Sequence, residues 1–461
     1  MCDGISDELE GIDLGDVRLN RRSKQVLKSL AANAESSVNM ACQTWADTIG
    51  AYRFFNNPEV TPEKILEPHR QATVERMRGQ PVVLIVQDTT ELDLTKHAPV
   101  DVRHLNSKHR RGVYLHDHIA VSPDKICLGV VGMDAFDRDV DSLGKTLERR
   151  TLPIEEKESF RWLKGYRLAC ELAAECPATQ VVSVADREGD IYDIFVDAAI
   201  QNEPRAEYVI RAQEDRSTFE PKPDVGPKVY GKVRDEVRSS PLRETRTLKL
   251  CATPKRAARQ TSVEIRAVQV QVKPPHARAY LPSVTHNVVL VEEIDGPQDG
   301  TDICWLLITT LPIKTLKEIL RVVKYYLARW VVEIFFRTLK TGCRVEEIQL
   351  ETKHRFLNCL ALYHIIAWRI LSLTYLNRVV PDISCTALFT DSEWKSTWRV
   401  VKKQKLPKKP PRLGELMTLI ACLGGYNNRA KEPPPGPEPI WVGIRRMVDF
   451  AIAWETFGPE S

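Results

Sequence analysis

The stretch PVVLIVQDTTELDLT, residues 81 to 95, decides the fold class of this sequence. Its first half is a continuous apolar run, which is typical of a strand buried on both faces of a sheet. We therefore expect a buried strand that ends at Asp88. The stretch TQVVSVADREGDIYD, residues 179 to 193, predicts a second buried strand that ends at Asp186, followed by a helix from about Asp190. Together they indicate an α/β protein with its site at the carboxyl ends of the strands.

Other segments fill in a mixed sheet. Residues 112–136 predict two strands joined by a turn, and residues 155–175 predict a helix. Residues 213–302 are rich in proline and contain alternating strands, so we expect a β insertion there. Within it the alternation changes phase between Ala267 and Val268, which predicts a bulge.

The first 70 residues or so predict a small helical unit. The segment VRLNRRSKQVLKSLAAN, residues 17 to 33, contains no acid and places Arg18, Arg21 and Arg22 on one side of a helix. A solvated surface face explains such a run more often than not. The lack of opposing charge within the segment is what makes DNA binding plausible.

The carboxyl-terminal part begins with a long apolar helix near residues 354–378. His364 and Arg369 interrupt its apolar run, which is short for a membrane span, so we expect a buried core helix. Basic and proline-rich linkers at 402–412 and 432–439 follow, before a last short helix. We therefore predict three domains: residues 1–70, 71–380 and 381–461.

Composition limits the function classes. The 461 residues include 66 basic and 62 acidic ones, a net charge of +4, so a polyanion must be met by local clusters of charge. Eleven cysteines without a CxxC pair fit a reducing cytosol, and we expect a cytoplasmic protein without a membrane span. No complete GxxxxGK[ST] motif is present, because Val233 follows the glycine and lysine of GPKVYGK, so no nucleotide cofactor is implied.

The segment YYLARWVVEIFFRTLKTG, residues 325 to 342, places charged side chains among bulky apolar ones. On a helical wheel Tyr326, Arg329, Glu333 and Lys340 share one face, with Arg337 at its edge. An ordinary amphipathic helix with pairs four residues apart explains this pattern by itself. Whether the stretch is one helix or two joined near Arg329 stays open.

Three acids suggest a specific chemistry. Hard carboxylate oxygens hold Mg²⁺, and two such ions assist phosphodiester cleavage by activating the attacking oxygen and neutralising the leaving one. Asp88, Asp186 and Glu333 are the candidate ligands. Each aspartate alone is as well explained by a strand-end turn or a helix cap. His116 and His118 alternate on a predicted strand, but no third ligand is spaced to complete a zinc site.

These motifs carry a resemblance. VQDTT, VADREGDIYD and the pattern Tyr, two residues, Arg, three residues, Glu, six residues, Lys resemble the bacterial cut-and-paste DDE transposases of the transposon-five type, in the insertion-sequence-four family. DLGDVRLNRR and GAYRFFNNP resemble the family's DNA-binding helices, and LGGYNNR resembles a segment near its carboxyl end. The similarity spans most of the chain.

The resemblance implies a ribonuclease-H-like catalytic core with a β insertion. It implies two Mg²⁺ ions, for which Mn²⁺ can substitute, held by Asp88, Asp186 and Glu333. It also implies a homodimer that bridges two double-stranded transposon ends, cleaves them through a hairpin and joins them to target DNA. The residues expected to contact DNA are Tyr326, Arg329, Lys340, Arg337, Arg211, Trp305, Arg18, Arg21 and Arg22.

Two alternatives stay open. A captured relative would bind DNA without cutting it, although the presence of all three acids argues against this. A ribonuclease-H-like nuclease of host metabolism would need neither the basic amino-terminal helix nor the Tyr326 to Lys340 set.

Overall fold

A computed structural model describes residues 2–42, 44–140, 152–200, 205–221, 230–250, 257–297, 299–430 and 432–458. The chain divides into two compact units. Unit 1 comprises residues 1–76, 89–144 and 331–461, and unit 2 comprises residues 77–88 and 145–330. The strand β1 (Val82–Asp93) passes from unit 2 into unit 1 at Asp88.

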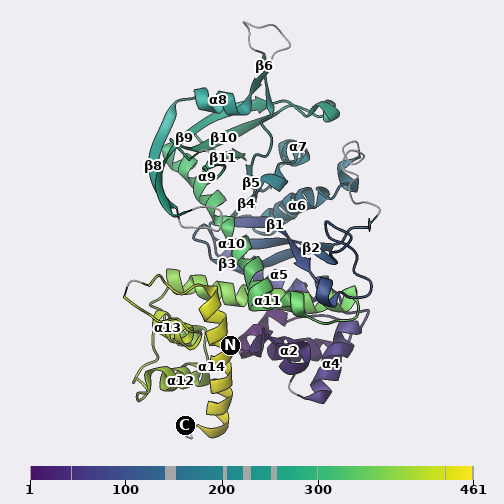
Figure 1. Ribbon diagram of the computed structural model, residues 1–461, viewed down its shortest axis with the longest axis vertical. Helices are drawn as coiled ribbons and strands as arrows, with labels where there is room; N and C mark the ends of the chain where they lie inside the picture. Colours follow the sequence, from purple (N-terminus) through teal and green to yellow (C-terminus); the bar gives the residue numbers. More distant parts are fainter. Residues whose placement is uncertain are drawn as a thin grey trace. The chain divides into compact units, whose positions relative to one another are not determined.

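Unit 2 is built on a mixed sheet. Its core is three parallel strands, β1, β4 (Gln180–Ala185) and β5 (Glu207–Arg211), in the order β1-β4-β5. Their continuous Val, Ile and Leu content fits burial on both faces. The helices α6 (Phe160–Glu175) and α7 (Tyr192–Ile200) lie beside these strands (Figure 1).

The β insertion continues the same sheet. Antiparallel β11 (Cys304–Thr309), β10 (Val284–Glu293) and β9 (Arg259–Val272) follow β5, and β8 (Leu242–Leu250) also pairs with β9. Two short strands, β6 (Ser217–Pro221) and β7 (Tyr230–Lys232), complete the order. A helix that the sequence did not predict, α8 (Val233–Ser239), contacts β9 and β10. After the insertion, α9 (Leu316–Ala328) packs on β4, β5, β10 and β11.

The predicted bulge in β9 is wrong. The pairing of β9 with β10 runs without a shift through Ala267 and Val268. Burial does change phase here, from Ala267 to Val270. The change falls where the other neighbour of β9 switches from β8 to β6.

In unit 1 the end of β1 precedes the hairpin β2 (Gly112–Val121) and β3 (Cys127–Phe136). The amino-terminal helices are α1 (Cys2–Ile5), α2 (Val17–Ala32), α3 (Val38–Ala41), α4 (Trp45–Asn56) and α5 (Pro62–Arg78). His69 on α5 holds this region together, because its Nδ1 lies 2.5 Å from the Glu8 carboxylate and its Nε2 accepts the Val130 N–H at 3.0 Å. Arg76 and His69 together lower the pKa of Glu8 to about 2, although burial opposes this shift.

The rest of unit 1 is helical. After α10 (Trp330–Arg337), α11 (Lys353–Val379) contacts α2, α4, β3 and the carboxyl-terminal helices α13 (Leu413–Leu423) and α14 (Pro437–Phe457). A further helix, α12 (Asp391–Lys402), contacts α13 and α14. By length and composition α11 could span a membrane, but 89% of its most apolar window is buried inside the protein. The prediction of a buried core helix is confirmed.

Two other predictions need correction. β1 does not end at Asp88 but continues to Asp93, because Thr89 and Thr90 favour a strand and Leu92 supplies a buried side chain. The last helix, α14, is not short, since its 21 residues bury Ile440, Ile444 and Met447 against the carboxyl-terminal core.

Candidate active site

The pairing among three neighbouring strands of unit 2 stops at about the same level. β1 and β4 are paired from Val82 and Gln180 to Val86 and Val184, and β4 and β5 are paired up to Ala185 and Ile210. Continuing both registers places Asp88 opposite Asp186, and Asp186 opposite Arg211. Adjacent strands lie about 4.8 Å apart, and residues opposite each other in a parallel pair point to the same face. Two acids and a base therefore line one edge of the sheet.

The carboxylate of Asp88 forms an ion pair in this edge. Its Oδ2 lies 2.8 Å from Nη1 of Arg329, and the two side chains are only 14% and 12% exposed. Arg329 follows the last residue of α9 and keeps helical angles, with φ −51° and ψ −35°. The structure therefore resolves the open question, because α9 and α10 are two helices joined at Arg329.

Asp186 is held differently. It is half-buried and caps the 3₁₀ turn η6 (Arg187–Gly189), with Oδ1 accepting the N–H of Glu188 at 2.8 Å. This local bond is the helix-cap explanation that the sequence left open. It engages one carboxylate oxygen, so capping and metal ligation by the other oxygen are compatible.

Three further predicted DNA contacts lie in unit 2. Arg211 donates from Nη2 to the Cys304 carbonyl at 3.0 Å. The ring of Trp305 on β11 lies 5.6 Å from that of Tyr326 on α9. Tyr326 is buried, so the ring pair is a core contact, but Trp305 is half-buried and leaves part of its ring accessible. This accessible aromatic ring directly follows Cys304, which Arg211 contacts.

Glu333, Arg337 and Lys340 lie in unit 1. Glu333 is half-buried on α10, four residues after Arg329, and Arg337 is exposed at the end of that helix. Lys340 lies in a π-helical turn, η8 (Thr338–Gly342), so the wheel of 3.6 residues per turn does not extend to it. The predicted shared face therefore ends at Arg337. Burial lowers the pKa of the Lys340 ammonium, although Glu346 and Glu91 oppose the shift.

The sequence analysis missed the acidic cluster around Lys340. Arg110 bridges Glu91 at 2.7 Å and Asp93 at 3.0 Å, and Glu346 accepts the N–H of Asp93 at 2.8 Å. Glu91 and Asp93 are two residues apart on β1, so their side chains point to the same face of the sheet. This spacing would have indicated the cluster if the strand had been predicted to continue past Asp88.

The donors fit a divalent metal by their chemistry. Asp88 and Asp186 are carboxylates at one sheet edge, and such hard oxygen ligands suit Mg²⁺. Within the described ranges no group of three His, Cys, Asp or Glu side chains is arranged as a metal site. At Asp88 the compensating positive charge comes from Arg329.

The predicted basic face of α2 is not unopposed. Arg18 pairs with Asp16 at 2.9 Å, Arg22 pairs with Asp47 at 3.2 Å, and Arg21 is exposed. Lys24 also pairs with Glu10. The acids come from residues outside the segment 17–33, which is why the segment alone suggested free charge.

A groove of about 350 Å³ lies along α4 in unit 1. Its walls include Trp45, which is 78% exposed, together with Tyr52, Arg53 and Asn56 of α4 and Arg355 of α11. Aromatic, guanidinium and amide groups are those that contact bases and phosphates.

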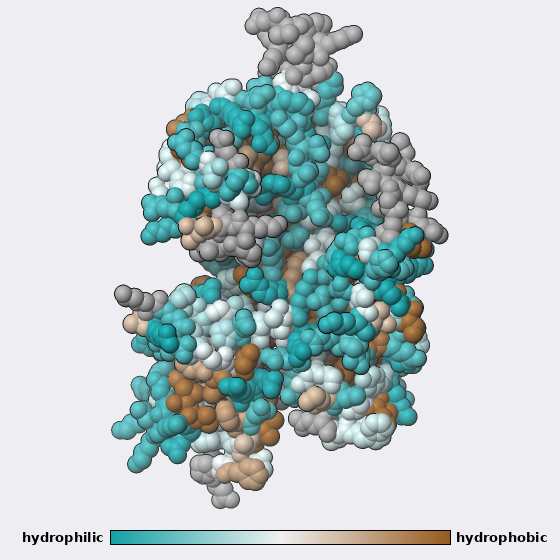
Figure 2. Space-filling model, in the orientation of Figure 1, coloured by the Kyte–Doolittle hydropathy of each residue, from teal (hydrophilic) through white to brown (hydrophobic). Residues whose placement is uncertain are grey.

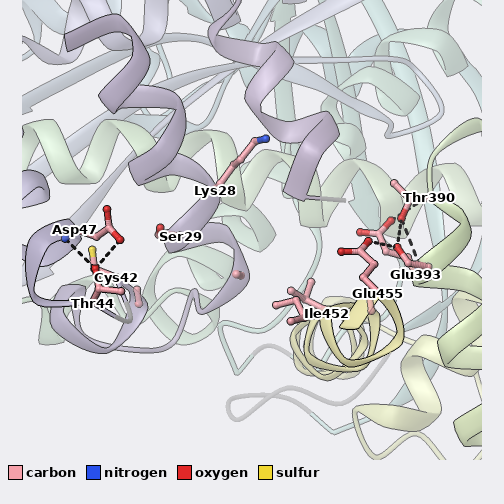
Figure 3. A pocket seen from close by; sticks show the side chains of 14 residues that line it. Lys28, Ser29, Cys42, Thr44, Asp47, Thr390, Glu393, Ile452 and Glu455 are labelled. Atoms are coloured by element: carbon pink, nitrogen blue, oxygen red, sulfur yellow. Dashed lines mark hydrogen bonds between the residues drawn. The ribbon is translucent and has the colours of Figure 1, made fainter. Parts of the chain in front are cut away.

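A second pocket, of about 290 Å³, is more acidic (Figure 3). Asp47 lies on one side, and Glu393 and Glu455 lie on the other, where Glu455 accepts the Ser392 hydroxyl at 2.6 Å. Lys28 lines it as well. Three carboxylates against one ammonium do not suit a nucleic-acid phosphate.

Comparisons with known proteins identify the family of the chain. Residues 1–60 match the family model described as transposase DNA-binding, residues 178–369 match the transposase DDE domain, and residues 365–455 match the transposase Tn5 dimerisation domain. The chain therefore belongs to the DDE transposases, with a ribonuclease-H-like fold. The first and last matches make it a member of the Tn5 type within that class. The DDE match contains Asp186 and Glu333 and begins after Asp88.

One solved structure is similar at low identity. It is the cryo-EM structure of a piggyBac transposase synaptic complex with hairpin DNA, at 10% identity and a TM-score of 0.34. The match covers 87% of this chain and 59% of the other chain. A likeness at this level carries no argument about function.

Proposed function

We propose that this chain is an active DNA transposase that cuts at terminal inverted repeats and joins the freed 3′ hydroxyls to target DNA. Residues 1–70 would bind the ends, residues 71–380 would form the catalytic domain, and residues 381–461 would contribute the dimer contact. The observation that carries the proposal is the edge of unit 2, where the extended registers align Asp88, Asp186 and Arg211.

The three acids would hold the metal ions. Asp88, Asp186 and Glu333 would bind two Mg²⁺ ions, which supply activation of the attacking oxygen and charge neutralisation at the leaving oxygen. Glu333 lies one helical turn after Arg329, and residues four apart share a helix face. The transposase DDE match, residues 178–369, includes Glu333 and supports its role as the third acid.

The basic residues would hold the scissile strand. A strand that is cut in line must be pinned by its phosphates, and the guanidinium of Arg329, already at the Asp88 carboxylate, is placed to do so. Tyr326, Lys340, Arg337 and Arg211 are the further candidates. A carboxylate partner keeps Arg329 ordered until a phosphate replaces it.

Water would attack first, and the freed hydroxyl would then form a hairpin that is reopened before joining. A hairpin needs a base turned out of the stack, which costs a few kcal/mol and is repaid by stacking on an aromatic ring. Trp305 supports this step because it is half-buried and braced at 5.6 Å by the Tyr326 ring.

DNA-end binding would use the groove of Trp45, Tyr52, Arg53 and Arg355. Its cationic and aromatic walls fit double-stranded DNA. The basic residues Arg18, Arg21 and Arg22 of α2 would contribute as well. The partners of Arg18 and Arg22 are exposed acids at a surface, where ion pairs contribute about 0–1 kcal/mol and can be exchanged for phosphates.

Dimer formation would use the carboxyl-terminal helices. Figure 2 shows apolar surface gathered over this region of unit 1. On α14, Phe457 is 85% exposed and Ile452 is 49% exposed, which leaves apolar area for a second copy of the chain.

One assay tests the proposal. The protein is incubated with Mg²⁺ and a plasmid that carries the flanking inverted repeats, and the products are separated under denaturing conditions. We expect excision with hairpin ends. The variant Glu333→Gln should lose cutting by a factor of about 10³ or more, because a metal ligand is removed, while binding to the repeats in a gel shift changes less than about twofold.

The outcomes separate the alternatives. A gel shift without cutting by the wild type would indicate a captured DNA-binding relative. Cleavage that ignores the repeats would indicate a host nuclease. Cutting by Glu333→Gln at the wild-type rate would overturn the assignment of the three acids.

A further inference from the structure

The turn after Asp186 is tightly packed. A Cβ atom on Gly189 would lie 2.5 Å from Cβ of Ala185 and 3.1 Å from the Trp162 ring, so only glycine fits this approach. At the start of the turn, Asp186 accepts the Glu188 N–H. The position of Asp186 therefore depends on where this turn is held.

Asp190 holds the other end of the turn. Its side chain is fully buried, and Oδ2 accepts the N–H groups of Gln213 at 2.8 Å and Glu214 at 2.9 Å. Oδ1 accepts from Arg216 through Nη2 at 2.6 Å and Nε at 3.2 Å. Both oxygens are thus saturated by the segment that follows β5.

Arg216 is itself fixed from several sides. It is 10% exposed, donates from Nη2 to the Asp190 carbonyl at 2.8 Å, and lies 5.6 Å and 5.5 Å from the ring centroids of Tyr192 and Phe195. These contacts to a carboxylate, a carbonyl and two rings hold the Arg216 side chain in one position. Arg216 therefore also holds Asp190, and with it the end of the turn, in place.

A buried ion pair of this kind is weak evidence for stability, since desolvation offsets the attraction. Its place in the sheet suggests another purpose. The bonds of Asp190 join the chain just beyond β4 to the chain just beyond β5, at the level where Asp186 is in register with Arg211.

We propose that Asp190 and Arg216 are positioning residues that set the Asp186 carboxylate for metal binding. This inference rests on the proposed function, because it takes Asp186 as a metal ligand. Groups that orient a metal ligand from behind typically change metal affinity by 10- to 100-fold when they are removed.

The test measures Mn²⁺ affinity of the full-length protein by calorimetry and electron paramagnetic resonance. Asp190→Asn keeps the size of the side chain but removes the charge that gathers Gln213, Glu214 and Arg216. We expect Mn²⁺ binding to weaken about tenfold or more. Binding of repeat DNA without metal should change less than about twofold, and the Mg²⁺ concentration for half-maximal cutting should rise in parallel.

A matched control lies in the same unit. Glu293 is 1% exposed and binds Arg259 through both oxygens, at 3.1 Å and 2.8 Å, in the β insertion. Glu293→Gln removes an equally buried charge without touching the turn. It should lower the melting temperature as Asp190→Asn does, but leave Mn²⁺ affinity unchanged.

Arg216→Lys gives a second variant if Asp190→Asn does not fold. Lysine keeps the charge but offers one donor group in place of the planar fork, so we expect a smaller loss of Mn²⁺ affinity than in Asp190→Asn, or than in Arg216→Gln. The proposal is overturned if the Asp190 and Arg216 variants melt earlier yet bind Mn²⁺ like the wild type. If the wild type does not bind Mn²⁺, or if the Asp186→Asn variant binds Mn²⁺ with the same affinity as the wild type, the proposed function is rejected and this inference with it.

Discussion

Asp88 lies within β1 and Asp186 directly follows β4, and the extended register puts them at the same level of one sheet, yet the two carboxylates are held in opposite ways. Asp88 is compensated by the side chain of Arg329, which lies 241 residues later in the sequence. Asp186 is held by the backbone of its own turn. A side-chain partner can be exchanged for a metal ion or a phosphate without unfolding anything, whereas a backbone turn cannot. The surroundings of Asp88 on β1 are therefore adjustable, and the turn that holds Asp186 at the β4 end is fixed.

The largest expected effect is the loss of stability when the Asp88 carboxylate on β1 is removed. Asp88→Asn removes the carboxylate that faces a guanidinium only 12% exposed, so we expect a loss of about 3 kcal/mol in the free energy of unfolding. Asp186→Asn should cost less than about 1 kcal/mol, because the amide oxygen still accepts the Glu188 N–H. Urea denaturation of both variants measures the difference.

The control for this experiment is an exposed pair. Arg412 and Asp382 lie 2.6 Å apart but are 72% and 76% exposed, so Asp382→Asn should cost less than about 0.5 kcal/mol. Equal losses for Asp88→Asn and Asp186→Asn would contradict the comparison.

A smaller effect tests the rigidity of the β4 end. Gly189→Ala places a methyl group 2.5 Å from Cβ of Ala185, and we expect overpacking to cost about 2 kcal/mol in thermal unfolding. Gly4→Ala is the control, because the nearest atom to its added Cβ lies 3.9 Å away. If Gly189→Ala unfolds at the wild-type temperature, the turn can move to accept a methyl group and does not hold Asp186 rigidly.

The smallest effect, taken over one pH unit, is a pH dependence at His286 on β10. Burial, and secondly the charge of Arg216, lower the pKa of His286 from 6.5 to about 3, and its ring lies 4.6 Å from that of Phe195 on α7. The unfolded chain therefore binds a proton below pH 6.5 that the fold excludes. Stability falls as pH drops from 6.5 towards 3, by about 1 kcal/mol between pH 6.5 and 5.5.

Chemical denaturation at several pH values checks this slope, with His286→Asn as the control. Asparagine does not titrate, so the variant should lose this part of the dependence while other groups keep theirs. An unchanged slope in His286→Asn would show that the histidine is protonated in the fold.

The sequence predicted most local features, because their causes are local. The apolar runs before Asp88 and Asp186 formed the strands expected. The hairpin expected over residues 112–136 is also present as β2 and β3, and in its turn the Lys125 N–H is bonded to the Ser122 carbonyl.

Partners distant in sequence could not be predicted. Nothing near Asp88 points to Arg329, and nothing in DREGDIYD identifies the residues 213–216 that surround Asp190. The π-helical turn at Lys340 changes the number of residues per turn, so a wheel drawn with 3.6 residues per turn places the Lys340 side chain on the wrong face. The acids that pair with Arg18 and Arg22 lie outside the basic segment, so its apparent excess of charge was misleading.

The buried helix α11 has a consequence for synthesis of the chain. Its 27 residues leave the ribosome before α13 and α14, which contact it in the finished unit. Until α13 and α14 have been synthesised, the largely apolar helix α11 is exposed and is a target for chaperones and for misdirected membrane insertion. A product truncated before residue 413 would keep that rod uncovered, so we expect such fragments to aggregate rather than to act as soluble inhibitors.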